Sequence, residues 1–429
     1  MIAANIGKIF LEAYNEKYKS NYSAKQFFVE KYFTLFFDHG KYMQWVINSP
    51  FVQGIKKGVA PTPQERKAKL DTLVDKISKN DADASIAIGF PSLDLIASTS
   101  GQITNQKLPF NEEDIYLSWI GSGFGIGVES GLIILFSNKE ILLDLFDGWQ
   151  FYRDYLNKTS ELKGNQINTW NGQWIAHRYN KRSYNALNPT AGLNAFDPIN
   201  DGRLEVATQS WTQVIIGIAR TFKENRLTSY IYSLSKTNIT IGFIPFEIPS
   251  IRKPYELYEK YFNVKPEYAE QLFGTELGFT KVCQMGAIGV NALEPKGFSD
   301  FITKGTIPNF NPNDEEKVIN FYTYQIWLLS MLNNEQLWDK SLEFAQLLIN
   351  YVAGSEKARA NRKTAVEELL KSTKKDKFLE NLIQIMKEPD SENCEEIGKE
   401  VHFMSGATEF PYFATLLRFQ YASLNKIKK

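Results

Sequence analysis

The sequence has few of the residues from which metal sites, disulfides and covalent active sites are usually built. Among 429 residues there are only two cysteines and three histidines. Cys283 and Cys394 are far apart and form no CxxC pair, so the sequence contains neither a disulfide framework nor a zinc knuckle. His39, His177 and His402 have no histidine or cysteine at ligand spacing, so we expect no metal site and no cofactor. Such sparse cysteine usage is typical of a reducing cytoplasm, which is the expected location.

Long apolar runs and the best-known catalytic motifs are also missing. Apolar runs such as GLIILF and VIIGIA are far shorter than the roughly 18 residues that a membrane span needs. The opening MIAANIGKIFLEAYNEKY carries charges within its apolar pattern and has no signal-peptide cleavage arrangement. The sequence contains no GK[ST], GxSxG, HExxH or EF-hand pattern. These absences predict a soluble protein with no membrane partner.

Glycine is concentrated in IGSGFGIGVESG, where it occupies every second position from Gly121 to Gly127. A dinucleotide-binding loop needs GxGxxG directly between a strand and a helix. Here the third glycine is out of register, and the apolar run SGLIILFS intervenes. We interpret IYLSWIG and SGLIILFS as strands. The glycines then form a face without side chains, against which another backbone packs closely.

The length and composition predict a folded protein of more than one domain. Hydrophobic residues make up 43% of the chain and aromatic residues 14%, enough for large cores. Helical spacing covers most of the first 50 residues, and TSYIYSLSKTNITIGFIPFEIP reads as a hairpin. After Asp314 the chain reads as amphipathic helices with short connections. We therefore expect an α+β fold, with a mixed α/β domain over 1–310 and an all-α helical bundle over 311–429.

Charge is distributed unevenly although the formal net charge is zero. Residues 162–255 contain 11 basic and 5 acidic residues, whereas residues 111–157 contain 2 basic and 8 acidic residues. A chain polarised in this way can turn a basic face toward a phosphate backbone.

The segment 162–196 contains no acidic residue but seven asparagines, four basic residues and several aromatic rings. Lysine and arginine neutralise phosphates, amide side chains bond to base edges, and aromatic rings stack on unpaired bases. An ordinary surface connection is the alternative, because asparagine is common in turns. The predicted nucleic-acid-binding residues of this segment are Lys163, Asn165, Gln166, Asn168, Asn171, Gln173, Arg178, Lys181 and Arg182.

Two other groups extend this prediction. Polar residues of two loops are candidates for contact with nucleic acid, namely Lys56, Lys57, Gln102, Asn105 and Gln106. A basic run near the C-terminus adds Arg359, Arg362 and Lys363, although such helical charge runs are usually solvated faces.

The strongest indication of an enzyme is FDPINDGRLEV, with Asp197, Asp201 and Glu205. Clustered carboxylates could hold a divalent metal for phosphodiester cleavage, which gives the alternative of a metal-dependent DNA-cleaving enzyme of a restriction-type system. A PD-(D/E)xK nuclease would also need a lysine two residues after its second acid, but Glu205 is followed by Val206 and Ala207. Asp-Pro and Asp-Gly favour a simple turn. His177 could act as a base but fits better as part of a basic loop.

The closing stretch VHFMSGATEFPYFATLLRFQYA resembles the C-terminal signature of the large subunits of type I CRISPR Cascade complexes, especially the I-B forms. SYIYSLSKTNITIGFIPFEIP is similar to strand sequences of the same family. The likeness falls on packing motifs, and no family residue is carried over to a position of this chain. The resemblance implies a non-catalytic subunit that recognises the protospacer-adjacent motif in double-stranded DNA. It also implies a role in strand opening and in recruitment of the helicase–nuclease, with guide RNA and other Cascade subunits as partners. A scaffolding protein without a nucleic-acid role is a further alternative.

Overall fold

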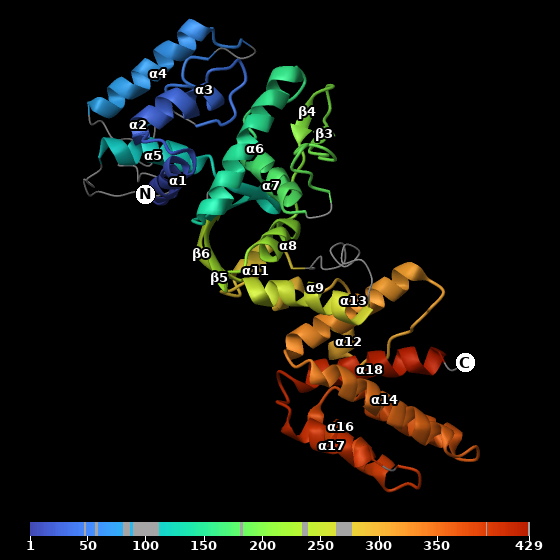
Figure 1. Cartoon of the computed structure of the whole chain (residues 1–429). Coiled ribbons are helices and arrows are strands. Elements are labelled where there is room, and N and C mark those ends of the chain that lie inside the picture. The colour runs from blue at the N-terminus through green and yellow to red at the C-terminus, as the bar shows by residue number, and fades with distance from the viewer. Residues whose placement is uncertain are drawn as a thin grey trace. The chain divides into compact units, whose positions relative to one another are not determined.

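The computed structural model of the chain describes residues 1–46, 49–55, 59–79, 86–88, 111–180, 183–233, 239–262, 277–391 and 393–427 (Figure 1). It divides into two compact units. Unit 1 comprises Met1–Phe246 with Cys283–Ala287, and unit 2 comprises Glu247–Val282 with Ile288–Lys429. The division predicted after residue 310 therefore lies inside unit 2.

Unit 1 combines helices with two small sheets. Its elements are α1 (Ile2–Tyr18), α2 (Ala24–Phe27), the π-helix η1 (Phe28–Tyr32), α3 (Phe33–Phe36), α4 (Pro63–Ser78), α5 (Glu112–Ser122), β1 (Ile126–Val128), the 3₁₀ helix η2 (Glu129–Gly131), β2 (Leu132–Phe136), α6 (Lys139–Lys158), α7 (Ile167–Arg178), β3 (Phe196–Pro198), β4 (Leu204–Val206), α8 (Trp211–Thr221), β5 (Arg226–Ser233) and β6 (Ile239–Glu247, whose last residue is grouped with unit 2).

Helices α1 and α5 approach each other closely because glycine lies at their contact. A Cβ atom on Gly7 would lie 2.1 Å from the carbonyl oxygen of Leu117, and one on Gly121 would lie 1.8 Å from that of Ala3. The predicted strand IYLSWIG is therefore wrong, since these residues belong to α5. The Asn111 side chain caps this helix by accepting a hydrogen bond from the Asp114 backbone, and every residue from 115 to 122 is buried. A helix buried on all sides shows no amphipathic period, which explains the error.

The larger sheet has the strand order β1-β2-β5-β6. β1 pairs with β2 and β2 with β5, both antiparallel, with Ile134 opposite Ile126 on one side and Ile231 on the other. β6 is an edge strand, in agreement with Pro245, which lacks the N–H that a central strand would need. The predicted strand SGLIILFS and the two strands of the predicted hairpin are confirmed, and the hairpin's turn lies outside the described residues.

Unit 2 consists of helices in the part of it that the structure describes. They are α9 (Ile248–Phe262), α11 (Phe279–Cys283, whose last residue is grouped with unit 1), the 3₁₀ helix η3 (Val290–Leu293), α12 (Ser299–Thr303), α13 (Glu315–Leu332), α14 (Gln336–Ala353), α15 (Arg359–Lys371), α16 (Lys375–Met386), α17 (Cys394–Phe403) and α18 (Phe410–Ile427).

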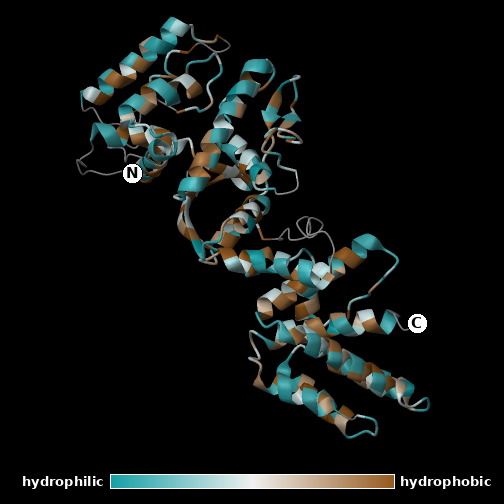
Figure 2. Ribbon diagram, in the orientation of Figure 1, coloured by the Kyte–Doolittle hydropathy of each residue, from teal (hydrophilic) through white to brown (hydrophobic). Residues whose placement is uncertain are grey.

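Helix α18 forms the centre of unit 2. It packs against α12, α13, α14 and α15, and its residues Phe413, Leu417 and Phe419 are fully buried. Asp314 caps α13 as expected, since its side chain accepts a hydrogen bond from the Lys317 backbone. Helices such as α14 and α16 carry both hydrophobic and hydrophilic residues (Figure 2) and bury only some of them, which is the pattern of helices packed around a shared core.

The fold class predicted from the sequence is confirmed, because a small antiparallel sheet with helices is followed by a helical C-terminal part. Among the described helices, none combines the length and apolarity that a membrane crossing requires.

Candidate nucleic-acid interface

The acid-free segment is mainly a helix, α7, packed against β1, α6 and α8. The backbones of α7 and β1 are in direct contact. A Cβ atom on Gly127 would lie 2.9 Å from the carbonyl carbon of Asn168, and one on Gly172 would lie 2.2 Å from the oxygen of Gly127. The expectation that the glycine-rich stretch admits another backbone is therefore confirmed at β1, because only glycine leaves this space.

The amide side chains of α7 bind the protein's own backbone. Asn171 is fully buried, and its Nδ2 donates to the carbonyl oxygens of Gly123 at 2.7 Å and Gly125 at 2.8 Å. Its Oδ1 accepts a hydrogen bond from Trp149 Nε1 at 3.1 Å. Asn168 Nδ2 also donates to Gly125, at 2.9 Å. These two amides fix β1 onto α7, so they are not placed to read base edges.

Two glutamines of the segment have the same role at β4. Gln166 Oε1 accepts a hydrogen bond from the Val206 backbone at 3.1 Å. Gln173 is buried, and its Nε2 donates to the carbonyl oxygen of Ala207 at 2.9 Å. Both amides satisfy backbone groups of the strand and of the residue after it, which would otherwise be costly to bury.

The predicted residues at the two ends of α7 remain near the surface. Lys163 and Asn165 are exposed before the helix, and Lys163 Nζ lies 3.7 Å from a carboxylate oxygen of Glu205. Arg178 is half-buried at the other end and pairs with Asp144 at 3.0 Å. Twelve helical residues separate the two ends, a distance of about 18 Å along the axis. The predicted residues therefore form two separate groups rather than one patch.

The residues after α7 form an exposed surface loop, 183–195, which we name the Asn loop. Its Leu187 side chain is 96% exposed. The Asn185 side chain holds the turn by accepting a hydrogen bond from the Leu187 backbone at 2.9 Å. Sequence reasoning overlooked Leu187, and no local signal marks it, because Leu193 in the same loop has similar neighbours but is only half-exposed.

Two side chains of α7 anchor the Asn loop. His177 Nε2 lies 2.9 Å from the carbonyl oxygen of Pro189. Because a carbonyl only accepts, this nitrogen donates, and burial lowers the pKa of His177 below its usual value. The Arg178 guanidinium lies over the Tyr184 ring, 4.5 Å from its centre. His177 thus fits the role of a loop anchor better than that of a catalytic base.

The basic run near the C-terminus lies on α15 in unit 2. Arg359 and Lys363 are exposed. Arg362 is buried and donates to the carbonyl oxygens of Tyr351 at 3.0 Å and Pro389 at 2.9 Å, and to the Asp390 carboxylate. Its guanidinium therefore has partners inside the unit and is not presented to a phosphate. The remaining predicted residues lie outside the described residues, and they are Lys56, Lys57, Gln102, Asn105, Gln106, Lys181 and Arg182.

The three carboxylates of FDPINDGRLEV lie on the β3–β4 hairpin. Asp197 and Glu205 face each other across the strands. Asp201 has a φ of 89° in the turn and pairs with Arg203 at 2.6 Å. The interpretation of Asp-Gly as a turn is thus confirmed. Within the described ranges, no group of three or more His, Cys, Asp or Glu side chains is suited to hold a metal ion.

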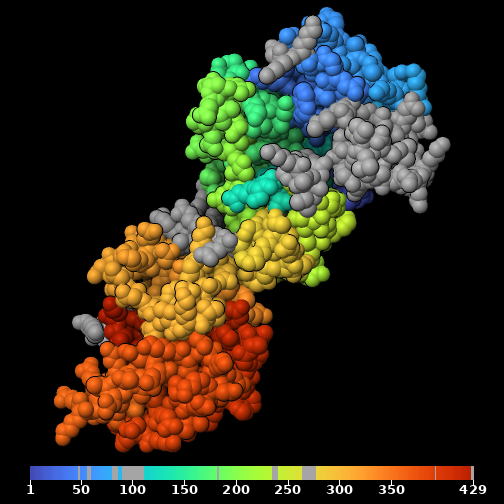
Figure 3. Space-filling view, turned by 180° about the vertical axis from the view of Figure 1, so that it is seen from behind, coloured from blue at the N-terminus to red at the C-terminus, as the bar shows by residue number. Residues whose placement is uncertain are grey.

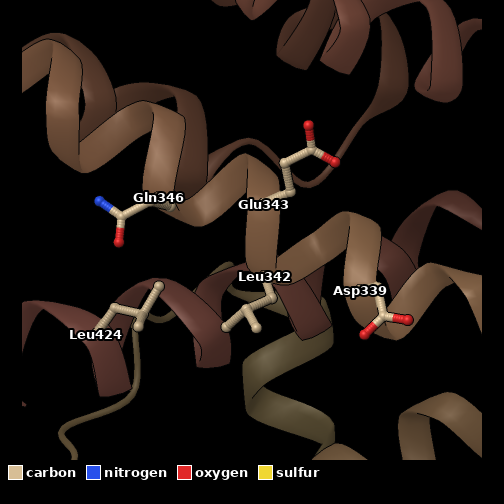
Figure 4. Close-up of a pocket in the computed structure, with 5 residues that line it drawn as sticks. All are labelled: Asp339, Leu342, Glu343, Gln346 and Leu424. Carbon is tan, nitrogen blue, oxygen red and sulfur yellow. The ribbon is translucent and has the colours of Figure 1, made fainter.

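A shallow depression on unit 2 lies between α14 and α18. Figure 4 shows its side chains, which are Asp339, Leu342, Glu343, Gln346 and Leu424. Two carboxylates border it and no basic residue lines it, so its charge disfavours a phosphate backbone.

No protein-family model matches the chain, and comparisons with curated proteins and with solved structures also find no significant match.

Proposed function

We propose that the chain is the non-catalytic large subunit of a type I, I-B-like, CRISPR Cascade complex. In this function it recognises the protospacer-adjacent motif in double-stranded DNA, aids strand opening and helps to recruit the helicase–nuclease. Guide RNA and the other Cascade subunits are its partners, so the working form is a ribonucleoprotein complex.

The Asn loop is the observation that carries this proposal. It combines exposed asparagines with the 96% exposed Leu187 in a segment without a single acidic residue. Asparagine amides can pair with base edges, and apolar side chains pack between base steps. The absence of carboxylates removes repulsion from the phosphates. The anchors from His177 and Arg178 restrict the loop, so less conformational entropy is lost on binding.

The order of the elements supports the same function. An α+β unit is followed by a helical unit, as the resemblance implies. The stretch that carries the resemblance, FPYFATLLRFQYA, lies within α18, so the likeness falls on residues that pack the core of unit 2.

The formal net charge of zero also fits a subunit of an assembly. A protein held in place by neighbouring subunits need not supply all of the affinity for DNA itself, because guide pairing and its neighbours contribute.

Co-purification from the native cells is the first test. We expect the tagged chain to retain an RNA of guide length with a constant 5′ end, together with Cascade backbone proteins. A clean monomer without RNA would overturn the proposal. A magnesium-dependent cleavage of naked DNA that disappears in Asp201→Ala would instead establish the nuclease alternative.

A substitution of Leu187 tests whether the Asn loop contacts DNA. Within the purified complex, Leu187→Ala should weaken binding to duplex DNA that contains the motif by roughly tenfold, the loss of one good contact. Leu342→Ala is the matched control, because Leu342 is also exposed, at 37%, but lies on α14 in unit 2. Equal affinities of the two variants and the wild type would remove the Asn loop from the proposal.

A further inference from the structure

Acidic residues recur every four positions along α14, and we name them the acidic row: Glu335 at the N-cap, Asp339 and Glu343. Residues four apart lie on the same side of a helix, where like charges destabilise it. The helix dipole offsets this cost for Asp339 in the first turn, but its effect does not extend to Glu343 one turn later. Cations placed against the acidic row therefore stabilise α14.

At the first acid of the row, the protein itself supplies such cations. Lys253 and Lys260 of α9 both pair with Glu335. Lys260 Nζ also lies 5.2 Å from the centre of the Tyr261 ring, and that ring lies 4.7 Å from the ring of Trp338 on α14. One end of α14 thus already holds a helix that places lysines on the acidic row and an aromatic ring on the apolar side chains beside it.

The same surface continues to the α14–α18 depression, where no helix among the described residues covers it. Leu342 follows Trp338 by four positions and is 37% exposed. Figure 4 shows its side chain between Leu424 of α18 and the Asp339 carboxylate. In Figure 3, red atoms of α18 reach the surface of unit 2 among the orange atoms of other helices. The depression measures about 360 Å³ and is open to solvent, so it can receive a side chain of a partner but encloses no small molecule.

The two remaining acids of the row have no ion-pair partner in the part of the chain that the structure describes. Both Asp339 and Glu343 are exposed. Lys340 is the one basic residue of α14, and it pairs with a glutamate of α17. Lys426 of α18 does not line the depression. The surface is therefore apolar at its centre and negative at its rim.

We propose that this depression docks a basic amphipathic helix of a partner protein. An apolar side chain of that helix contacts Leu342 and Leu424. Two of its lysines or arginines, one helical turn apart, pair with Asp339 and Glu343, which lie about 6 Å apart along α14.

The charge of the rim selects this occupant. The carboxylates repel a nucleic acid and an anionic membrane. A second copy of the same surface would bring its own acids against them. The depression lies on unit 2, apart from the Asn loop, so the inference goes beyond the proposed function.

Fluorescence anisotropy of the full chain with a labelled helical peptide tests the inference. The probe has about 18 leucine and lysine residues, with the leucines along one face. The double variant Asp339→Lys, Glu343→Lys should weaken its binding by roughly tenfold or more, because two attractive pairs become repulsive. Asp71→Lys, Asp75→Lys on α4 is the matched control, since these exposed acids have the same spacing in unit 1.

Two further measurements separate the apolar contact from the charges. Leu342→Ala should weaken binding of the lysine peptide by about threefold to tenfold, since it removes apolar surface from the contact. A peptide with glutamate in place of lysine should bind the double variant Asp339→Lys, Glu343→Lys and not the wild type. This gain of binding also shows that the double variant is folded.

Four results would overturn the inference. These are no binding of the lysine peptide, equal binding by the two double variants, full affinity in Leu342→Ala, or no binding of the glutamate peptide to the charge-reversed variant. Equally tight binding of spermine, with the same dependence on Asp339 and Glu343, would assign the depression to a small polyamine instead of a protein helix.

Discussion

In each unit a buried arginine donates hydrogen bonds to carbonyl oxygens at the end of a helix. The two units differ in the polar side chains that lie near this arginine. In unit 1, Arg153 on α6 donates to the carbonyl oxygens of Leu35 at 2.7 Å, Phe36 at 3.3 Å and Lys41 at 3.0 Å. Leu35 and Phe36 end α3, so their carbonyls have no acceptor role within that helix. The guanidinium supplies a donor to the Leu35 carbonyl and a second donor to that of Phe36, which also accepts from the Met43 backbone, and it complements the negative end of the helix dipole.

In unit 2, Arg418 on α18 does the same for other helix ends. It donates to the carbonyl oxygens of Leu370, of Ser372 at 2.9 Å and of Phe301 at 3.0 Å. Leu370 lies in the last turn of α15, and Ser372 is its C-cap. Burial lowers the pKa of Arg418 to about 10 and that of Arg153 also to about 10, so both remain charged near neutral pH.

The difference lies in the neighbouring polar groups. Unit 1 adds the buried amides of α7, which bind the backbone of β1, whereas α18 in unit 2 is surrounded mainly by apolar side chains. The comparison teaches that asparagine and arginine enrichment does not by itself indicate a nucleic-acid surface. The most deeply buried of the predicted nucleic-acid-binding residues is Asn171 in unit 1 and Arg362 in unit 2, and each binds the protein's own backbone.

Replacement of Arg418 should have the largest effect. Arg418→Met removes the donors of at least three carbonyls, and we expect a loss of about 3–5 kcal/mol in the free energy of unfolding. Urea denaturation gives this value, and hydrogen exchange shows whether unit 2 alone loses protection. Arg359→Met is the control, because Arg359 is exposed on α15, and it should change the free energy of unfolding by less than about 0.5 kcal/mol. A loss of unfolding free energy in Arg418→Met as small as that of the control would contradict the role of Arg418 in satisfying these carbonyls.

The corresponding change in unit 1 is Asn171→Leu. It removes the partner of the Trp149 indole N–H and of the Gly123 carbonyl, while the Gly125 carbonyl keeps its hydrogen bond from Asn168, so we expect a loss of about 2–3 kcal/mol. The same denaturation experiment measures it. Asn188→Ala in the exposed Asn loop is the control and should be near neutral. If exchange protection falls in unit 2 rather than in unit 1, the assignment of this amide to unit 1 is wrong.

Gly121→Ala sharpens the role of glycine in unit 1. Its Cβ would lie 1.8 Å from a backbone oxygen of α1, so the two helices must separate, at a cost of about 1–3 kcal/mol. Thermal unfolding monitored by circular dichroism should show a lower midpoint. Gly278→Ala has no atom within 4 Å of the new Cβ and should be neutral or stabilise by up to about 1 kcal/mol. Equal midpoints for both variants would contradict the close helix contact.

The smallest expected effect is on the pH dependence of stability, and it concerns Glu335 at the start of α14 in unit 2. Lys253 and Lys260 on α9 lower the pKa of Glu335 to about 2. Because the folded pKa lies below the unfolded value, this contribution to stability is present above about pH 4.5 and is lost as the pH falls toward about 2. Glu335→Gln should therefore destabilise the protein slightly at about pH 7, by a margin that narrows with acidification. Urea denaturation of the variant and the wild type at about pH 7 and at about pH 3 checks this, and an equal margin at both pH values would contradict it.

Several elements were predictable because their local signals are strong. The helix after Asp314 has a capping side chain, and β2 has a continuous apolar run. By contrast, α5 was mistaken for a strand. Its cap Asn111 and the acidic residues Glu112, Glu113 and Asp114 in its first turn are helix signals that outweigh its lack of periodicity.

The candidate site was predictable only in part. The absence of acidic residues singled out the segment 162–196 in the sequence, but side-chain direction depends on what the helix packs against. Asn165 and Asn171 have the same chemistry and lie six positions apart, yet one is exposed and the other is fully buried. The α14–α18 depression escaped notice for the same reason, since its side chains come from two helices that are distant in the chain.

The sequence by itself determined the α+β class and the helical C-terminal part, because hydrophobic periodicity and capping residues act over one or two helical turns. It also determined that the glycine of β1, Gly127, admits another backbone, since glycine alone lacks the Cβ that would block it. Only the tertiary structure decided that amides of α7 and the guanidinium of Arg362 are internal. It also decided that Leu187 and Leu342 face the solvent. Those outcomes depend on contacts between residues distant in the chain, where the cost of leaving a buried carbonyl unpaired exceeds the local preference of any single side chain.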